Sequence, residues 1–236
     1  MPVHRSTPAS RVTIWQLNLS DWRRWGDACE SMLTPSELAQ ADRFRHPEGR
    51  QRFVLGRGMM RGVLGKLLDA KPREVALQFS GQGKPHLAGE DGMHFNLSHS
   101  GEMILLGVTS NGEIGVDIEA FRHLPRRDQI AEGILSATEL NQYETLSDAQ
   151  RQAAFFTIWT RKEAIVKAVG RGLCFPLTDV EVSFTPDARV LRFGEAVGED
   201  IPWRLSSIAC PAGYAAALAT SHQPSEISVN NWMPNG

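Results

Sequence analysis

The sequence has little of what marks exported, membrane-spanning or nucleic-acid-binding proteins. Its three cysteines, Cys29, Cys174 and Cys210, are odd in number, far apart and never arranged as CxxC, so neither a disulfide framework nor a zinc site is indicated. No run of about eighteen apolar residues could span a membrane, and the first ten residues lack the apolar core of a signal peptide. The formal net charge of -2 argues against a dedicated binder of nucleic acid or membrane surfaces. We therefore expect a soluble, cytoplasmic protein.

One segment departs from this near-neutral balance. Between Arg43 and Arg61 the chain carries arginine at six positions and only one acidic residue, Glu48. Such a segment can bind a polyanion, or it can form the solvated basic face of a helix.

The order of hydrophobic patterns predicts an α+β (α/β) chain with two similar halves. Strand-like alternation occurs over 12–19 and in short runs between 74 and 108, and helical spacing lies between them. After the turn signal Asn111-Gly112 the second half repeats this mixture: the apolar run at 113–121 comes first, helical spacing follows, and short strand-like runs lie toward its end. We therefore expect two halves and a loosely ordered polar tail, over residues 1–110, 111–220 and 221–236.

Two carboxylates stand in the apolar run "IGVDIE" at 114–119. In a strand, side chains at i and i+2 share a face, so Asp117 and Glu119 would lie side by side while Val116 and Ile118 face the core. Carboxylates about 6 to 7 Å apart suit Mg²⁺ when phosphates and water complete its octahedron. The alternative is a solvated strand end with two charges on its wet face.

A second cluster lies in "WTRKEAIVKAVGRGL" at 159–173, where the spacing predicts a helix. Trp159, Glu163 and Lys167 follow at intervals of four and share one helix face. Glu163 and Lys167 could form an ordinary surface ion pair worth about 0.2 to 0.5 kcal/mol. Beside a third anionic group, Glu163 could instead complete a metal shell or act as a general base, and Lys167 could hold a phosphate.

A third cluster, "NLSHSG" at 96–101, follows an apolar strand pattern. Ser98, His99 and Ser100 could converge on an anion, although a histidine near a strand end also serves as a structural hydrogen-bond partner. Serine hydrolase chemistry is poorly supported because no serine lies in a GxSxG elbow. The glycine-rich stretches "GRGMMR" and "GVLGKLL" lack residues that a dinucleotide fingerprint and a P-loop require.

Four motifs, "GKPHL", "FNLSHSG", "IGVDIE" and "WTRKEAIVKAVGRGL", occur in this order over residues 83–173. They closely resemble the motifs of the 4′-phosphopantetheinyl transferases of the surfactin-synthetase-activating type. The segment "RFVLGRGMMR" and the overall length extend the likeness to about residue 220. The resemblance implies an enzyme that passes the phosphopantetheine arm of coenzyme A to a serine of an acyl or peptidyl carrier protein and releases 3′,5′-adenosine bisphosphate. Mg²⁺ on the pyrophosphate would neutralise the charge that grows on the leaving phosphate.

The resemblance also implies roles for individual residues. The metal ligands would be Asp117, Glu119 and Glu163. Catalysis would depend on Asp117, His99 and Glu163, with Glu163 as the base for the carrier serine. The phosphates of coenzyme A would contact Lys84, Ser98, His99, Lys162 and Lys167. Arg52 and Arg57 lie where the family places basic residues against the adenosine 3′-phosphate, although each could also belong to a solvated helix face.

In the architecture that the resemblance implies, two pseudo-two-fold-related halves, each a small sheet packed with helices, enclose the active site in the cleft between them. The first half would contact phosphates, and the second would hold the metal and dock the carrier. The partners would be coenzyme A and carrier domains of fatty-acid, polyketide or non-ribosomal peptide synthases, and the protein would be a monomer. Two other functions could use the same residues: a catalytically silent module that binds coenzyme A or a nucleotide, and a Mg²⁺-dependent phosphohydrolase of coenzyme A.

Overall fold

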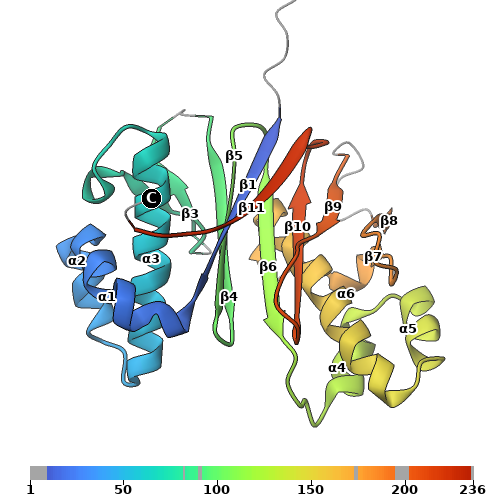
Figure 1. Ribbon diagram of the computed structural model, residues 1–236. Helices are drawn as coiled ribbons and strands as arrows, with labels where there is room; N and C mark the ends of the chain where they lie inside the picture. Colours follow the sequence, from blue (N-terminus) through green and yellow to red (C-terminus); the bar gives the residue numbers. More distant parts are fainter. Residues whose placement is uncertain (1–9, 82, 90–91, 173–174, 195–201, 235–236) are drawn as a thin grey trace, which may run out of the picture.

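The two halves of the chain have the same order of helices and strands (Figure 1). The computed structural model describes residues 10–81, 83–89, 92–172, 175–194 and 202–234, so Leu173 and Cys174 of the patterns above lie outside the described residues. The first half contains β1 (Arg11–Asn18), α1 (Trp22–Met32), α2 (Pro35–Ala41), α3 (Pro47–Leu67), β2 (Leu77–Phe79), β3 (Pro85–Leu87), β4 (His94–Ser100) and β5 (Met103–Thr109). The second contains β6 (Ile114–Ala120), α4 (Arg127–Ile134), α5 (Ala137–Glu144), α6 (Asp148–Val169), β7 (Val180–Val182), β8 (Val190–Phe193), β9 (Arg204–Ser207) and β10 (Tyr214–Thr220). The prediction of an α+β fold with two similar halves is confirmed.

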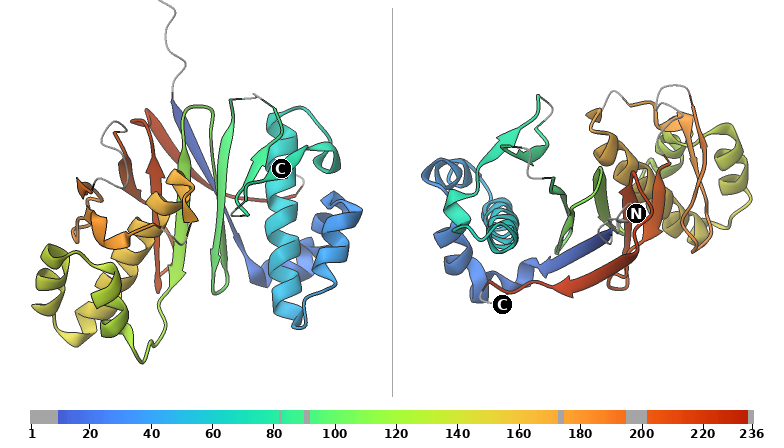
Figure 2. Two further views of the ribbon diagram at one scale, coloured as in Figure 1. Left: turned by 180° about the vertical axis from the view of Figure 1, so that it is seen from behind. Right: turned by 90° about the horizontal axis from the view of Figure 1, so that it is seen from above.

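The main sheets of the two halves repeat one strand order. The first half has the antiparallel order β1-β5-β4, and the second has the antiparallel order β6-β10-β9. Each half adds a two-stranded hairpin, β2-β3 or β7-β8. The views from the front and from above show the long helices α3 and α6 on opposite sides of the pair of sheets (Figures 1 and 2).

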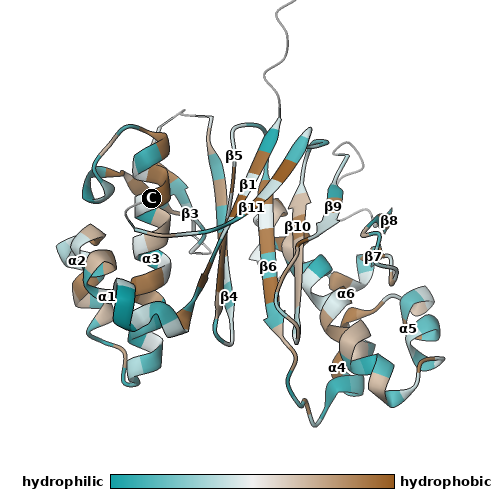
Figure 3. Cartoon of the chain, in the orientation of Figure 1, coloured by the Kyte–Doolittle hydropathy of each residue, from teal (hydrophilic) through white to brown (hydrophobic). Residues whose placement is uncertain are grey.

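Three apolar clusters hold these layers together. One packs beneath α3 in the first half, one packs beneath α6 in the second, and a third joins the two sheets through residues such as Ile14, Leu105, Val116 and Leu218. All seven residues of β5 are buried, and Figure 3 shows this strand brown along its length. Because the third cluster takes residues from both sheets, it joins the two halves through a shared apolar interface.

The glycine of "IGVDIE" sets the distance between β6 and α6. A Cβ atom at Gly115 would lie 2.0 Å from the carbonyl oxygen of Ala164 and 2.4 Å from the amide nitrogen of Ala168. Both are backbone atoms of α6, so no side chain other than hydrogen fits there. This close approach brings the helix that carries Glu163 against the strand that carries Asp117.

The prediction of a loosely ordered tail was wrong. Residues Glu226–Asn231 form β11, which pairs in parallel with β1 along Arg11–Gln16 and extends the first sheet to the order β11-β1-β5-β4. The strand was not predicted because its sequence is polar and β11 is largely exposed. It is held by main-chain hydrogen bonds to β1. Helix α1 was also not predicted, since only Gly26 and Cys29 among its residues are buried.

Candidate active site

Strands β4 and β6 meet at the junction of the two halves and are linked by side chains. Asn96, Ser98 and Ser100 alternate along β4, so they share the face that looks toward β6. Their side-chain oxygens accept hydrogen bonds from the backbone amides of Val116 at 2.9 Å, Ile118 at 3.4 Å and Ala120 at 3.1 Å respectively. This polar ladder fixes the register of "NLSHSG" against "IGVDIE".

Asp117 points from β6 into the same junction and is only 4% exposed. Its Oδ1 accepts hydrogen bonds from Ser98 Oγ at 2.9 Å and from Lys167 Nζ at 2.6 Å. Burial raises the pKa of Asp117, and the Lys167 ammonium opposes this effect. The second oxygen, Oδ2, is buried and has no hydrogen-bond partner among the described residues. An additional cation would satisfy this oxygen.

Glu119 repeats the arrangement two residues along the strand. Its Oε2 accepts a hydrogen bond from Ser100 Oγ at 2.7 Å and forms an ion pair with Arg122 Nη1 at 2.7 Å. Each β6 carboxylate is therefore held by one serine of β4 and by one cation, with both contacts on a single oxygen.

The third carboxylate, Glu163, comes from α6. It lines a cavity of about 230 Å³ between the halves together with Leu97, Ser98, His99, Asp117, Glu119, Trp159 and Lys167. Burial raises the pKa of Glu163, and the negative charges of Asp117 and Glu119 raise it further. A carboxylate with a raised pKa, close to two others, suits a general base that works near neutral pH.

A second, more apolar cavity of about 480 Å³ shares Leu97, Trp159, Glu163 and Lys167 with the first and continues to Lys84 and Phe175. The ring of Trp159 stacks on Phe155, with the ring centroids 6.0 Å apart. Trp159 therefore forms a wall of both cavities and stiffens the helix face that bears Glu163.

The sequence-predicted basic residues of the first half lie at different places. Arg52 donates a hydrogen bond to the carbonyl oxygen of Gly101 at 3.2 Å. Burial lowers the pKa of His99, and the charges of Arg52 and Lys167 lower it further, so these two cations lie near His99 and favour its neutral form. Arg57 lies over the rings of Phe53 and Phe79, at 5.4 and 4.8 Å from their centroids. It therefore sits on an aromatic patch of the first half rather than on the carboxylate cavity.

Lys84 and Lys162 have structural contacts that sequence analysis did not anticipate. Lys84 Nζ donates hydrogen bonds to the carbonyl oxygens of Lys167 at 2.7 Å and Ile114 at 3.4 Å, so it ties the first half to the second at the cavity wall. Lys162 is only 1% exposed. Its ammonium contacts Glu139 Oε2 at 2.6 Å and the carbonyl oxygens of Ile134 and Leu177 at 2.7 and 2.8 Å. The predicted phosphate contact of Lys162 is therefore corrected to a buried structural contact.

The donor chemistry of the cavity fits a hard divalent cation. Asp117, Glu119 and Glu163 offer only carboxylate oxygens, and Asp117 presents an unsatisfied buried one. As the side chains stand, however, no three His, Cys, Asp or Glu residues of the described part of the chain are arranged to hold a metal ion. The side chains of these carboxylates would have to turn toward a common point.

Comparison with known proteins places the chain in a family. Residues 113–219 match the family model described as the 4′-phosphopantetheinyl transferase superfamily, and residues 13–111 match the one described as 4′-phosphopantetheinyl transferase, N-terminal. A relative named 4′-phosphopantetheinyl transferase HetI, from Nostoc sp., is 35% identical over 78% of this chain and 79% of its own length. One named 4′-phosphopantetheinyl transferase Sfp, from Bacillus subtilis, is 27% identical over 84% of this chain and 88% of its own.

The solved structure of Thermotoga maritima holo-[acyl-carrier-protein] synthase aligns with a TM-score of 0.38 and 25% identity, covering 45% of this chain and 61% of that one. The sequence matches are the stronger finding. The chain belongs to the 4′-phosphopantetheinyl transferase family, and it is a transferase enzyme. No helix within the described ranges has the length and apolar character needed to cross a membrane.

Sequence analysis missed three groups that shape the site. Asn96 belongs to the ladder on β4, and its alternation with Ser98 and Ser100 was the available signal. Glu139 was signalled by the capping-box pattern that it forms with Ser136, but not its pairing with Lys162. Arg122 follows "IGVDIE" in the sequence, and only the structure shows its contact with Glu119.

Proposed function

We propose that this enzyme transfers the 4′-phosphopantetheine group of coenzyme A to a serine hydroxyl of an acyl or peptidyl carrier protein, with Mg²⁺ as cofactor. The observation that carries the proposal is that Asp117, Glu119, Glu163 and Lys167 line one cavity between the halves of a chain that belongs to this family. Two of these groups come from β6 and two from α6, so the fold has brought together the parts of two separate motifs.

In the proposed reaction the carrier serine oxygen attacks the phosphorus next to the pantetheine arm, and 3′,5′-adenosine bisphosphate leaves. Glu163 accepts the serine proton, directly or through water, and its raised pKa suits this role. Asp117, Glu119 and Glu163 would hold Mg²⁺ or Mn²⁺, both of which suit carboxylate and water ligands. When bound, the ion would neutralise charge on the pyrophosphate. Ser98 donates a hydrogen bond from its hydroxyl to Asp117 and so positions that carboxylate.

We assign the phosphate contacts to the cations that reach the cavity. Lys167 pairs with Asp117 and lines the cavity, so a phosphate can replace the carboxylate as its partner. Arg52 is a cation near His99 that suits the 3′-phosphate or pyrophosphate, His99 can donate a hydrogen bond to a phosphate from its neutral ring, and Lys84 stands at the wall of the second cavity. The place of Arg57, on Phe53 and Phe79, suits the adenosine end of coenzyme A better than the reacting phosphate.

Within the family we propose the surfactin-synthetase-activating type, supported by the order and wording of the four motifs. The partners would be carrier domains of fatty-acid, polyketide or non-ribosomal peptide synthases, docked on the second half, 111–220, while 1–110 would contact coenzyme A. We also propose a monomer in the cytoplasm. The free thiols of Cys29 and Cys210 support a reducing compartment.

The test is to incubate the protein with coenzyme A, Mg²⁺ and a panel of apo carrier proteins and to weigh the carriers by mass spectrometry. We expect at least one carrier to gain a single phosphopantetheine, and EDTA to abolish the gain. No gain with any carrier would point to a silent binding module. Release of adenosine bisphosphate without a carrier would point to a phosphohydrolase.

A further inference from the structure

Arg122 pairs with Glu119, one of the three carboxylates of the proposed metal site. Its Nη1 lies 2.7 Å from Glu119 Oε2, the same oxygen that accepts the Ser100 hydroxyl. The side chain of Glu119 is 18% exposed, whereas that of Arg122 is 53% exposed. Arg122 therefore contacts Glu119 from the more exposed side of the pair.

Arg122 and Lys167 form a matched pair of counter-ions. Lys167 neutralises Asp117 at 2.6 Å, and Arg122 neutralises Glu119 at 2.7 Å. Without such cations, the negative charges of the three carboxylates would repel one another across a cavity of about 230 Å³. The two cationic side chains, Lys167 and Arg122, have different surroundings to turn to when a divalent ion binds. Lys167 lies inside the cavity and can turn to a phosphate, whereas Arg122 has open solvent behind it.

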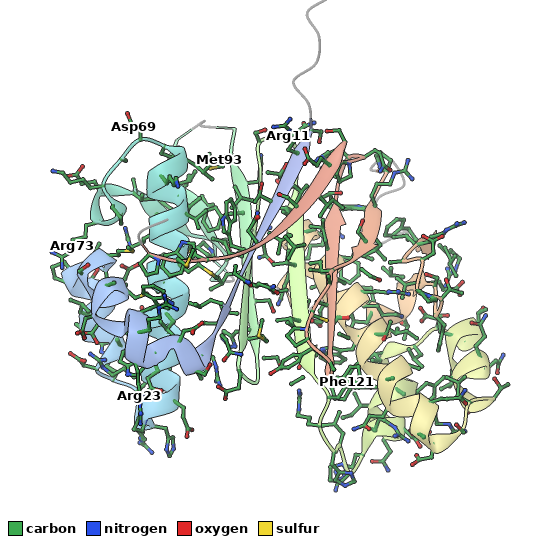
Figure 4. The ribbon with its side chains drawn as sticks, viewed as in Figure 1. Arg11, Arg23, Asp69, Arg73, Met93 and Phe121 are labelled. Atoms are coloured by element: carbon green, nitrogen blue, oxygen red, sulfur yellow. The ribbon has the colours of Figure 1, made fainter. Side chains whose placement is uncertain are left out.

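A hydrogen bond holds the backbone of Arg122 in place, and its guanidinium has a second contact besides the one with Glu119. Its carbonyl oxygen accepts a hydrogen bond from Gln152 Nε2 on α6 at 3.2 Å. The neighbouring Phe121, labelled at the end of β6 in Figure 4, stacks on Phe156 of α6 with ring centroids 5.4 Å apart. The Arg122 guanidinium already lies 5.4 Å from the centroid of the same Phe156 ring. The guanidinium thus has a contact with an aromatic ring that does not depend on Glu119 Oε2.

We propose that Arg122 is a counter-ion latch on Glu119, a positioning residue that holds this carboxylate in the metal-free protein and releases it when a divalent cation binds. The proposal rests on the proposed metal site. It explains why three carboxylates line one cavity although no three of the described acidic side chains converge as they stand. The cation and Arg122 compete for the same oxygen, so loss of Arg122 strengthens cation binding.

The test measures Mn²⁺ binding by electron paramagnetic resonance, with neither coenzyme A nor a carrier present. We expect Arg122→Gln to lower the Kd for Mn²⁺ on the order of fivefold, as expected for removing one partly solvated like charge. Arg122→Lys keeps the charge and should stay near the wild type. Arg126→Gln is the matched control, because it makes the same charge change at the exposed N-cap of α4, and it should shift the Kd less than about twofold.

Equal Mn²⁺ affinities in the Arg122→Gln and Arg126→Gln variants would overturn the latch and leave the metal site intact. Weaker binding in Arg122→Gln would also overturn it, because Arg122 would then orient Glu119 for the ion. Absence of Mn²⁺ binding in the wild type and in both variants would overturn the metal site and the latch together. A further readout is salt: the difference between wild type and Arg122→Gln should shrink as ionic strength rises, since the exposed ion pair is screened.

Discussion

Asp117 is the residue at which the needs of the fold and of the site conflict most. It is buried in the junction of the two halves, and burial raises its pKa, so the ionised carboxylate costs folding stability at neutral pH. Ser98 and Lys167 offset only part of this cost, because both contact Oδ1 and leave Oδ2 without a partner. The proposed cation would pair with Oδ2 and offset the rest of this cost.

We predict that Asp117→Asn removes Mn²⁺ binding and transfer but does not lower the free energy of unfolding at pH 8 in metal-free buffer. Since the folded pKa is raised, the stability contributed by protonated Asp117 is full at low pH and is lost as pH rises through that pKa. Relative to Asp117→Asn, the wild type should therefore gain stability as pH falls. Denaturant titrations of both proteins from pH 8 to 5 measure this difference. A wild type that loses stability relative to the variant would contradict the assigned direction of the pKa shift.

Among the elements, the two long helices are anchored in the same way. On α6, Lys162 pairs with Glu139 of the α5 capping box, and on α3, Arg61 pairs with Glu37 of the α2 capping box, each at 2.6 Å. Both cations also donate to backbone carbonyls beyond the helix, Lys162 to Leu177 and Arg61 to Pro72. Because the three cavity carboxylates all come from the second half, the repeat of this contact in the first half indicates that Lys162 serves the fold.

We predict that Lys162→Met lowers the free energy of unfolding by roughly 3 to 5 kcal/mol, because Glu139 stays buried without its partner. Arg61→Met is the matched control, and its free energy of unfolding should fall by about as much. The double variant Lys162→Met, Glu139→Gln should lose less, and its Kd for coenzyme A, measured by calorimetry, should stay within about twofold of the wild type. Lys167→Met should show the opposite pattern: it should bind coenzyme A weakly, and its free energy of unfolding should change little. A Lys162→Met protein of normal stability that binds coenzyme A poorly would restore the phosphate role.

In the whole molecule, the internal repeat makes β1 of the first sheet equivalent to β6 of the second, and only β6 carries residues of the site. Val12 pairs with the last residue of β5, and Ile114 pairs with the last residue of β10, so Trp15 and Leu17 of β1 stand where Asp117 and Glu119 stand on β6. Strand β4 runs beside the edge of β6, and β11 runs in parallel beside the edge of β1. The end of the chain thus closes the edge that lacks carboxylates.

We predict that a chain ending at His222, and so lacking β11, is less stable and self-associates, because the edge of β1 is left unpaired. Light scattering with size-exclusion chromatography and thermal unfolding measure both effects. Trp232, 7% exposed and packed against Gly62, gives a milder test. Trp232→Ala should cost roughly 3 to 5 kcal/mol, whereas Met233→Ala, at an exposed position, should cost less than about 0.5 kcal/mol. A truncated chain that stays monomeric and equally stable would show that β11 is dispensable.

Local sequence determined most of the elements and the chemical inventory of the site. The alternation in "IGVDIE" predicted strand β6 with two carboxylates on one face, and the four-residue spacing of Trp159, Glu163 and Lys167 predicted their shared face on α6. These patterns depend only on the periodicity of side chains within one helix or one strand, which is why a single sequence can reveal them. The elements that it did not reveal, α1 and β11, have few buried residues and so leave little hydrophobic signal.

Only the tertiary structure decided which charged groups meet. Lys162 and Lys167 lie on one helix, yet one is buried against Glu139 and the other reaches Asp117, because the rotation of α6 is fixed by its packing on Gly115 of β6. Arg122 is held on Glu119 by the return of the chain against α6. The sequence by itself determined that this chain has three carboxylates suited to a cation. The distances between elements determined that they line one cavity, since ion pairing depends on through-space separation that sequence spacing does not encode.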